Sequence, residues 1–324
     1  MKKKVFIPDP DISQATAMIK FIRRYTQFEI ITSSDLLEGK GRSFQDIDLN
    51  TDTDIDYILP CGAEATTKIL SKHKKIDFFE FQMDQDVLRC NDKLFMFDLC
   101  DELNIPIPKT STSYKNIEFP LYFKQHNEYI EGKVKERGVI KTERQLKGIS
   151  NSHDYIFQEL IDGSSTYGFA FIAKDGKVLS SFQFEEVLSN PLAGGNGVLL
   201  KTSHESTVKQ YSETLIAGLN YNGWGLAEFK YSNKYNDFYF MEINAKLWAS
   251  LEFTLLNNTD FFYNMFGVSY KTNKVTKAVY IDRLLNLFLH QYCFLLPEII
   301  HSKFLYARDF YGTLKSFFKK YVGY

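Results

Sequence analysis

Short apolar blocks alternate with helical patterns over the first ~85 residues. Apolar runs suited to strands occur in KVFIP, FEIITS, DYILPCG and KIDFF, and helical periodicity runs through ATAMIKFIRRY and AEATTKILSKH. Alternation of this kind is typical of a small parallel sheet covered by helices. The pattern therefore predicts an N-terminal parallel α/β domain.

A different pattern begins in CNDKLFMFDLCDELNIPIPKT. Asn91 is placed to cap a helix, and Ile-Pro-Ile-Pro then ends it. The residues predicted to face inward are Leu94, Phe97, Leu99 and Leu103. The segment predicts a hinge between domains, followed by a strand (PLYFKQ), a charged glycine-containing loop (EGKVKERG), a helix and a second strand (YIFQEL).

The region from Thr166 to Ile243 has an antiparallel pattern. The strands YGFAFIA and KVLSSFQF meet at the turn Lys174-Asp175-Gly176, and GLAEFKYS and DFYFMEI flank NKYN. Two hairpins of an antiparallel sheet are predicted. No internal repeat or low-complexity segment is visible in the chain.

The stretch FYFMEINAKLWAS carries polar groups at the end of an apolar strand. Because residues two apart share a face of a strand, Glu242 and Asn244 should lie on one face together with Phe238 and Phe240. The other face would then carry the intervening residues Tyr239, Met241 and Ile243.

Glu228 lies on the preceding strand and is a second carboxylate for this face. If the loop is centred on Tyr235, Glu228 lies directly opposite Glu242, where like charges repel unless a cation lies between them. Two carboxylates and an Asn oxygen suit Mg²⁺ bound together with phosphates. The alternative is a solvated sheet face with Lys230 as a neighbour.

Lys93 and Lys124 are candidate phosphate ligands, because each stands at the end of a predicted element. For each lysine taken singly, the alternative is an ordinary surface residue, which is the commoner place for a lysine. The loop Gly132 to Gly138, with Lys133, Lys135 and Arg137, could fold over a polyphosphate or be a solvated loop. No Walker A sequence occurs, and no GxGxxG follows a strand, so a nucleotide site would be of another kind.

Composition narrows the class of protein. The chain has 324 residues, 44% of them hydrophobic, and a formal net charge of -1, which argues against binding nucleic acid by bulk charge. The four cysteines form no CxxC or metal-ligand spacing: Cys61, Cys90, Cys100 and Cys293. The apolar run after MKKK stops at Pro8, too short for a signal peptide, so a cytoplasmic protein is expected.

Five segments together resemble the ATP-grasp superfamily, in its carbamoyl-phosphate-synthase-like branch of carboxylate-amine ligases. They are NDKLFMFDLCDELNIPIPKT, PLYFK, YIFQELIDG, GWGLAEFKY and FMEINAKLWASL, in the order typical of that family. The resemblance implies an α/β and α+β fold with an N-terminal α/β domain at 1–90, a hinge helix and lid at 91–161, and a C-terminal antiparallel domain at 162–266. A helical extension over 267–324 would follow.

The resemblance also implies an activity and a site. ATP and Mg²⁺, with Mn²⁺ as an alternative, would activate a small-molecule carboxylate as an acyl phosphate for attack by an amine. Lys93 and Lys124 would bind the ATP phosphates, and the metal ligands would be Glu228, Glu242 and Asn244. The adenine would meet the hinge residues Gln158, Glu159, Leu160 and Ile161.

Lys246 stands where the family pattern Glu-Ile-Asn-Pro-Arg has arginine, and it is the candidate catalytic residue. Lysine keeps the charge but lacks the bidentate fork of arginine. The acidic residue that holds the ribose in the family would fall near Ser165, so Asp162 is a candidate substitute. These departures leave open a second hypothesis, a non-catalytic ATP-binding module that serves a partner protein.

Two further segments carry alternatives. SNPLAGGNGVLLKTS is placed to close on the second substrate, because Gly194, Gly195 and Gly197 allow close backbone approach, or it is a simple connection. The apolar run 284–300 is interrupted by polar residues, so it makes a poor transmembrane helix. The tail would form two packed amphipathic helices, or it would contact a membrane surface through Phe317, Phe318, Lys319, Lys320 and Tyr321.

Overall fold

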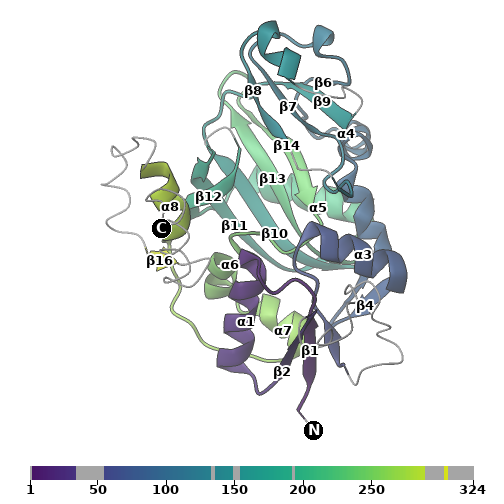
Figure 1. Ribbon diagram of the computed structural model, residues 1–324, viewed down its shortest axis with the longest axis vertical. Coiled ribbons are helices and arrows are strands. Elements are labelled where there is room, and N and C mark those ends of the chain that lie inside the picture. The colour runs from purple at the N-terminus through teal and green to yellow at the C-terminus, as the bar shows by residue number, and fades with distance from the viewer. Residues whose placement is uncertain are drawn as a thin grey trace.

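The computed structural model describes residues 2–33, 55–132, 136–148, 154–191, 194–288 and 303–305. A large, mainly antiparallel sheet lies in the middle of the molecule, with a small N-terminal sheet at one end and a second small sheet at the other (Figure 1). This mixed architecture agrees with the predicted fold class. None of the described helices is long and apolar enough to cross a membrane.

The N-terminal region contains the predicted parallel sheet, in the order β2-β1-β3. Its elements are β1 (Lys4–Ile7), α1 (Ser13–Tyr25), β2 (Glu29–Thr32), β3 (Tyr57–Ile58) and α3 (Ala63–His73). Each of these elements overlaps a segment predicted from the sequence. The alternation of strands and helices therefore gave the correct fold for this region.

The fourth predicted strand, β4 (Lys75–Asp77), does not join the parallel sheet in the described part of the chain. It pairs antiparallel with β5 (Gln82–Asp84) instead. The connection between them, closed by a bond from Phe78 N to Phe81 O of 2.8 Å, is far too short for a parallel crossover. The prediction that this strand belongs to the parallel sheet was therefore wrong.

The predicted hinge helix is α4 (Lys93–Glu102), and it follows the 3₁₀ helix η2 (Gln85–Asn91). Its N-cap is Asp92, whose carboxylate accepts bonds from the N–H groups of the next turn, and not Asn91 as predicted. The fully buried residues of α4 are Lys93, Met96, Phe97 and Cys100. The predicted inward residues Leu94, Leu99 and Leu103 are only partly buried.

The second small sheet has the order β6-β9-β7-β8. Its elements are β6 (Thr110–Ser111), η3 (Tyr114–Asn116), β7 (Leu121–Gln125), β8 (Arg137–Ile140), η4 (Glu143–Gly148) and β9 (Tyr155–Glu159). It has a small core of its own, made by Ile117, Leu121, Ile140, Tyr155 and Phe157. This sheet lies within the segment predicted to form the lid, and its role as a lid stays a prediction.

The large sheet has the order β14-β13-β10-β11-β12-β15-β16. Its strands are β10 (Thr166–Lys174), β11 (Lys177–Asn190), β12 (Asn196–Thr202), β13 (Gly223–Ser232), β14 (Asp237–Asn244), β15 (Lys277–Tyr280) and β16 (Lys303–Leu305). Both predicted hairpins are present. The first turns at Asp175 and Gly176, which have φ values of 50° and 70° and suit a two-residue hairpin turn.

Helices cover both faces of the large sheet. They are α5 (Ser206–Gly218), α6 (Leu251–Asn257), α7 (Asp260–Phe266) and α8 (Ile281–Phe288). Phe253 of α6 contacts Phe182 and Phe184 on one face. Phe171, on the other face, contacts Tyr221 just after α5. We refer to the first of these as the α6 face.

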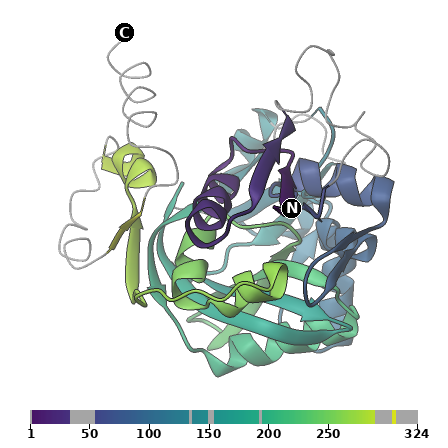
Figure 2. The same cartoon turned by 90° about the horizontal axis from the view of Figure 1, so that it is seen from below.

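The N-terminal region and the large sheet share one core. The ring of Tyr57 lies 5.3 Å from that of Phe266, and Phe78 lies 4.8 Å from Trp224. Figure 2 shows α1 next to α6, in agreement with their contacts. The exact domain boundaries stay a prediction. The tail residues Phe317 to Tyr321, and the second predicted tail helix, lie outside the described residues.

Candidate active site

Glu228 and Glu242 lie directly opposite each other on β13 and β14, which confirms the register predicted from the sequence. The Nδ2 atom of Asn244 donates to Oε2 of Glu228 at 2.7 Å and to Oε1 of Glu242 at 3.2 Å. The three residues predicted as metal ligands are therefore one cluster. The pairing of Glu228 with Gly168, and of Gly168 with Phe184, puts this cluster on the α6 face.

A β-bulge at Met241 produces this register. On the turn side of the bulge, the pairing is centred between Lys234 and Tyr235, and not on Tyr235 as predicted. The extra residue Met241 then restores the predicted pairing of Glu228 with Glu242. The predicted pair is thus correct, although the assumed regular hairpin is not.

The bulge also changes which residues share a face with the carboxylates. Phe240 pairs with Phe229, and their rings meet 5.6 Å apart on the face opposite Glu242. Ile243 lies on that opposite face as well, because strict alternation fails across an extra residue. The prediction that Phe238 and Phe240 share the face of Glu242 was therefore wrong.

Both candidate phosphate lysines are buried beside this cluster. Lys93 is 2% exposed and Lys124 is 4% exposed, so the surface alternative was wrong for both. Lys124 Nζ donates to the Met241 carbonyl oxygen at 2.9 Å and lies 3.9 Å from Glu242 Oε2. Lys93 Nζ lies 3.5 Å from the same carboxylate oxygen. The site thus holds opposite charges at close range.

Glu128 is a site residue that the sequence analysis missed. Its carboxylate is 6% exposed and lies between two lysines, 3.1 Å from Lys93 Nζ and 2.8 Å from Lys246 Nζ. Burial would lower the pKa of Lys93, but Glu242 and Glu128 raise it above its ordinary value. Lys93 therefore keeps its charge in the protein interior.

Backbone hydrogen bonds fix the position of Glu128. The N–H of Glu128 donates to Asn91 O at 2.8 Å, and the N–H of Lys93 donates to His126 O at 2.8 Å. Asp92 and Asn127 form the isolated bridge between these bonds. The chain after β7 is thus paired with the start of α4, and no local sequence pattern indicates such a long-range pairing.

Glu128→Gln should lower the free energy of unfolding by about 2–4 kcal/mol, because it removes one partner of a buried ion-pair network. Chemical denaturation of the isolated protein measures this change. Glu131→Gln is the matched control, since Glu131 is 78% exposed and lies 3.6 Å from Lys68, and it should cost under about 0.5 kcal/mol. Equal effects of the two variants would contradict the role of Glu128.

Burial and neighbouring carboxylates disfavour the charged form of two carboxyl groups at this site. Burial, Glu242 and then Glu186 raise the pKa of Glu228 to about 8. Burial also raises the pKa of Glu186 to about 7, against the opposing effect of Arg283 and Lys230. A carboxylate whose pKa is raised in this way is stabilised when it binds a proton or a cation.

The donor chemistry of the cluster fits a hard divalent cation, with one adjustment. In the described residues no group of three or more His, Cys, Asp or Glu side chains is arranged to hold a metal. An ion would therefore use Glu228, Glu242 and one amide. Asn244 Oδ1 accepts from Lys246 Nζ at 2.5 Å, so the amide must turn over to present its oxygen.

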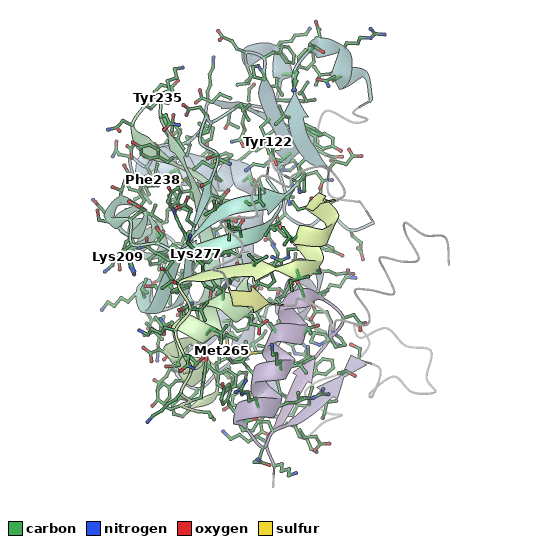
Figure 3. The ribbon with its side chains drawn as sticks, turned by 90° about the vertical axis from the view of Figure 1, so that its left-hand side faces the viewer. Tyr122, Lys209, Tyr235, Phe238, Met265 and Lys277 are labelled. Carbon is green, nitrogen blue, oxygen red and sulfur yellow. The ribbon has the colours of Figure 1, made fainter. Side chains whose placement is uncertain are left out.

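A cavity of about 580 Å³ opens beside the cluster, between the large sheet and the second small sheet. Glu228, Glu242 and Lys124 line it, and so does Tyr122 of β7. Figure 3 shows Tyr122 on the small sheet, with Phe238 and Tyr235 on the hairpin of the large sheet. The volume is within the usual range for small-molecule sites.

Sequence comparison alone gives no assignment, because no protein-family model and no curated protein matches the chain. Solved structures do share its fold. The ADP complex of PurK, N5-carboxyaminoimidazole ribonucleotide synthetase, has a TM-score of 0.61 at 13% identity, over 90% of this chain and 84% of that one.

Two further structures agree with this likeness. Phosphoribosylamine–glycine ligase from Thermotoga maritima has a TM-score of 0.59 at 12% identity, over 81% of this chain and 73% of that one. The L-amino acid ligase from Bacillus licheniformis has a TM-score of 0.55 at 11% identity, over 79% of this chain and 70% of that one. The chain has the ATP-grasp fold. The fold expected from the five sequence segments is thereby confirmed.

Three of the four residues predicted to meet the adenine line the cavity: Glu159, Leu160 and Ile161. Gln158 is not among its lining residues. The Gln158 side chain is fully buried, and its Nε2 donates to Thr110 Oγ1 at 2.9 Å. Gln158 thus ties β9 to β6.

Asp162, the candidate ribose ligand, already has several partners. Its carboxylate accepts bonds from Ser232 Oγ at 2.8 Å, Asn233 N at 3.0 Å and Lys234 N at 3.1 Å. The bond from Ser232 is the largest of the causes that lower the pKa of Asp162. These bonds hold the turn of the second hairpin, so a ribose would compete with them.

The glycine segment and the charged loop both reach the cavity in part. Gly194 and Gly195 line it, and a Cβ on Gly195 would lie only 2.1 Å from the Asn190 carbonyl. Arg137 also lines the cavity, but it belongs to strand β8 and not to a loop. Lys133 and Lys135 lie outside the described residues. A role in closing the site stays a prediction for both segments.

Proposed function

We propose that this chain is an ATP-dependent ligase that activates a small-molecule carboxylate as an acyl phosphate and joins it to an amine. The observation that carries the proposal is the pairing of Glu228 with Glu242 beside two buried lysines at one cavity. The ADP complex and the ligases among the solved structures with this fold support it.

Each group in the cluster has a proposed place. Lys93 and Lys124 would bind the ATP phosphates, and the hinge from Glu159 to Ile161 would meet the adenine. Mg²⁺, or Mn²⁺ as an alternative, would bind to Glu228, Glu242 and a turned Asn244. The ion would neutralise phosphate oxygens and hold them in line for transfer.

The proposed reaction has two steps. A substrate carboxylate oxygen attacks the γ-phosphorus while the bond to the bridging oxygen breaks, which gives an acyl phosphate and ADP. The amine nitrogen then attacks the acyl carbon, phosphate leaves, and the nitrogen loses a proton. Lys93, Lys124 and Lys246 reduce the repulsion between the two anions, and closure of the lid would limit hydrolysis of the acyl phosphate.

The ion pair between Lys246 and Glu128 favours a second candidate function, a non-catalytic ATP-binding module. Lys246 stands where arginine is expected, and a carboxylate already meets its charge at 2.8 Å. ADP release across pooled carboxylates and amines separates the two functions. A ligase should show substrate-stimulated ADP release, whereas the module should bind ATP without releasing ADP.

Lys124→Ala should weaken ATP binding by about 1.5–3 kcal/mol, the scale of a charge-assisted hydrogen bond. Titration calorimetry with ATP measures the change, and circular dichroism checks that the variant is folded. Lys141→Ala is the control, because Lys141 is exposed just after β8 of the same sheet. An unchanged ATP affinity in folded Lys124→Ala would remove Lys124 from the proposed site.

A further inference from the structure

A second cavity, of about 1230 Å³, lies on the same face of the large sheet beyond α6. Phe182 of β11 lines it, whereas residues 186–189 of the same strand line the first cavity. Phe253 of α6 packs on Phe182 and Phe184 between the two. The second cavity is therefore separate from the proposed nucleotide site.

Side-chain and backbone hydrogen bonds hold the walls of this cavity in place. Asn258 Nδ2 donates to the Ser181 carbonyl at 2.8 Å, which ties the end of α6 to β11. Asn257 Oδ1 accepts from Val275 N at 2.9 Å, and Thr202 N donates to Thr276 O at 2.9 Å. The segment 271–276 is thereby fixed as one wall, so the cavity is formed without a ligand.

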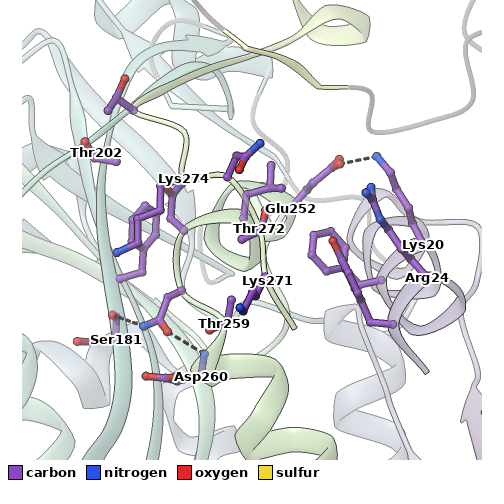
Figure 4. A pocket seen from close by; sticks show the side chains of 18 of the residues that line it. Lys20, Arg24, Ser181, Thr202, Glu252, Thr259, Asp260, Lys271, Thr272 and Lys274 are labelled. Atoms are coloured by element: carbon purple, nitrogen blue, oxygen red, sulfur yellow. Dashed lines mark hydrogen bonds and ion pairs between the residues drawn. The ribbon is translucent and has the colours of Figure 1, made fainter. Parts of the chain in front are cut away.

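Positive charge collects around the cavity. Lys20 and Arg24 project from α1 on one side and Lys274 lies on the other (Figure 4). Lys20 pairs with Glu252 at 2.5 Å. Arg24 and Lys274 form no ion pair with any carboxylate in the described part of the chain.

Lys271 lies on the same wall as Lys274 and likewise has no carboxylate partner in the described ranges. Asp260 is the remaining lining carboxylate, against three lining cations without a carboxylate partner among the described residues: Arg24, Lys271 and Lys274. Like charges that converge on a concave surface produce a positive potential there, which an anion relieves. The arrangement therefore selects for anionic ligands.

We propose that this cavity binds a small ligand with at least two negative charges, carried by phosphate or carboxylate groups. Arg24, Lys271 and Lys274 would pair with those groups. The rings of Tyr25 and Phe182 offer apolar surface to the body of the ligand. The site rests on this cavity alone and does not depend on the proposed ligase activity.

Titration calorimetry in metal-free buffer tests the site with citrate, pyrophosphate and neutral glucose as probes. The full chain should bind citrate or pyrophosphate and not glucose. The double variant Lys271→Ala/Lys274→Ala should raise the dissociation constant about tenfold or more, since it removes two charged partners. Both side chains are exposed, so folding should be unchanged.

Two control variants locate the binding. Lys209→Ala removes an exposed lysine of α5, at the edge of the molecule in Figure 3, and should leave the affinity unchanged. Lys124→Ala should leave the binding that the double variant removes unchanged, because Lys124 lines the first cavity and would affect only pyrophosphate bound there. If the double variant loses binding of citrate alone, the ligand of the second cavity carries carboxylate groups. If it loses binding of pyrophosphate alone, the ligand carries phosphate groups. No binding of either anion, or loss in Lys124→Ala but not in the double variant, would overturn the proposal.

Discussion

Glu242→Gln is expected to abolish Mg·ATP-dependent turnover while the protein stays folded. Glutamine has nearly the same volume as glutamate but carries no charge. The substitution therefore removes the negative charge that lies close to Lys93 and Lys124 and directly opposite Glu228. A loss of at least about 100-fold in kcat is expected, the scale of a removed transition-state interaction. Glu228→Gln should act in the same direction.

The stability of Glu242→Gln separates loss of function from loss of fold. Glu242→Gln relieves the repulsion with Glu228 but removes a partner of Lys93 and Lys124, so the metal-free variant should unfold cooperatively at a somewhat lower denaturant concentration than the wild type. Glu185→Gln is the matched control, because Glu185 is a buried carboxylate on the opposite face of β11, 2.8 Å from Lys201. Wild-type turnover in folded Glu242→Gln would exclude the metal assignment.

Lys246→Ala should lower kcat and kcat/KM together by about 100-fold, while ground-state ATP affinity changes little. This pattern is expected if Lys246 stabilises charge that develops during phosphoryl transfer. Steady-state kinetics and ATP calorimetry on the same preparation measure both quantities. Substrate-stimulated ADP release at the wild-type rate would remove Lys246 from the catalytic role.

Lys246→Arg is the informative companion. Arginine offers a planar fork and could contact both a phosphate and Glu128, which already accepts from Lys246 at 2.8 Å. Activity at or above that of Lys246→Ala is therefore expected. Activity below that of Lys246→Ala would mean that the space around Glu128 and Asn244 does not admit the larger group.

The sequence predicted the carboxylate pair because its evidence is local. Glu228 and Glu242 flank one short hairpin, so their spacing brings them close to opposite positions, and the bulge at Met241 completes the pairing. The N-terminal strands and helices were likewise predictable, since burial on one face imposes a period on the sequence. Lys93 and Lys124 stand near the ends of predicted elements, so they could be named as candidates from the sequence. Their burial could not be predicted from the sequence pattern.

The remaining features depend on contacts between distant segments. The alternation of apolar residues in β14 does not indicate the bulge at Met241. The Met241 carbonyl oxygen accepts a hydrogen bond from Lys124, which belongs to another sheet. Glu128 reaches the site because the chain after β7 pairs with the start of α4. The first two residues of strand β8, Arg137 and Gly138, were predicted as part of a loop, because they end a charged and glycine-containing segment.

A hydroxylamine assay tests the proposed chemistry most directly. Hydroxylamine attacks an acyl phosphate at carbon and releases phosphate, so it replaces the unknown amine and only the carboxylate must be screened. A ligase should give equal amounts of ADP and hydroxamate with at least one carboxylate, and both products should depend on Mg²⁺ and be absent in Glu242→Gln. ATP binding without ADP or hydroxamate from any carboxylate would contradict the ligase and favour the non-catalytic module.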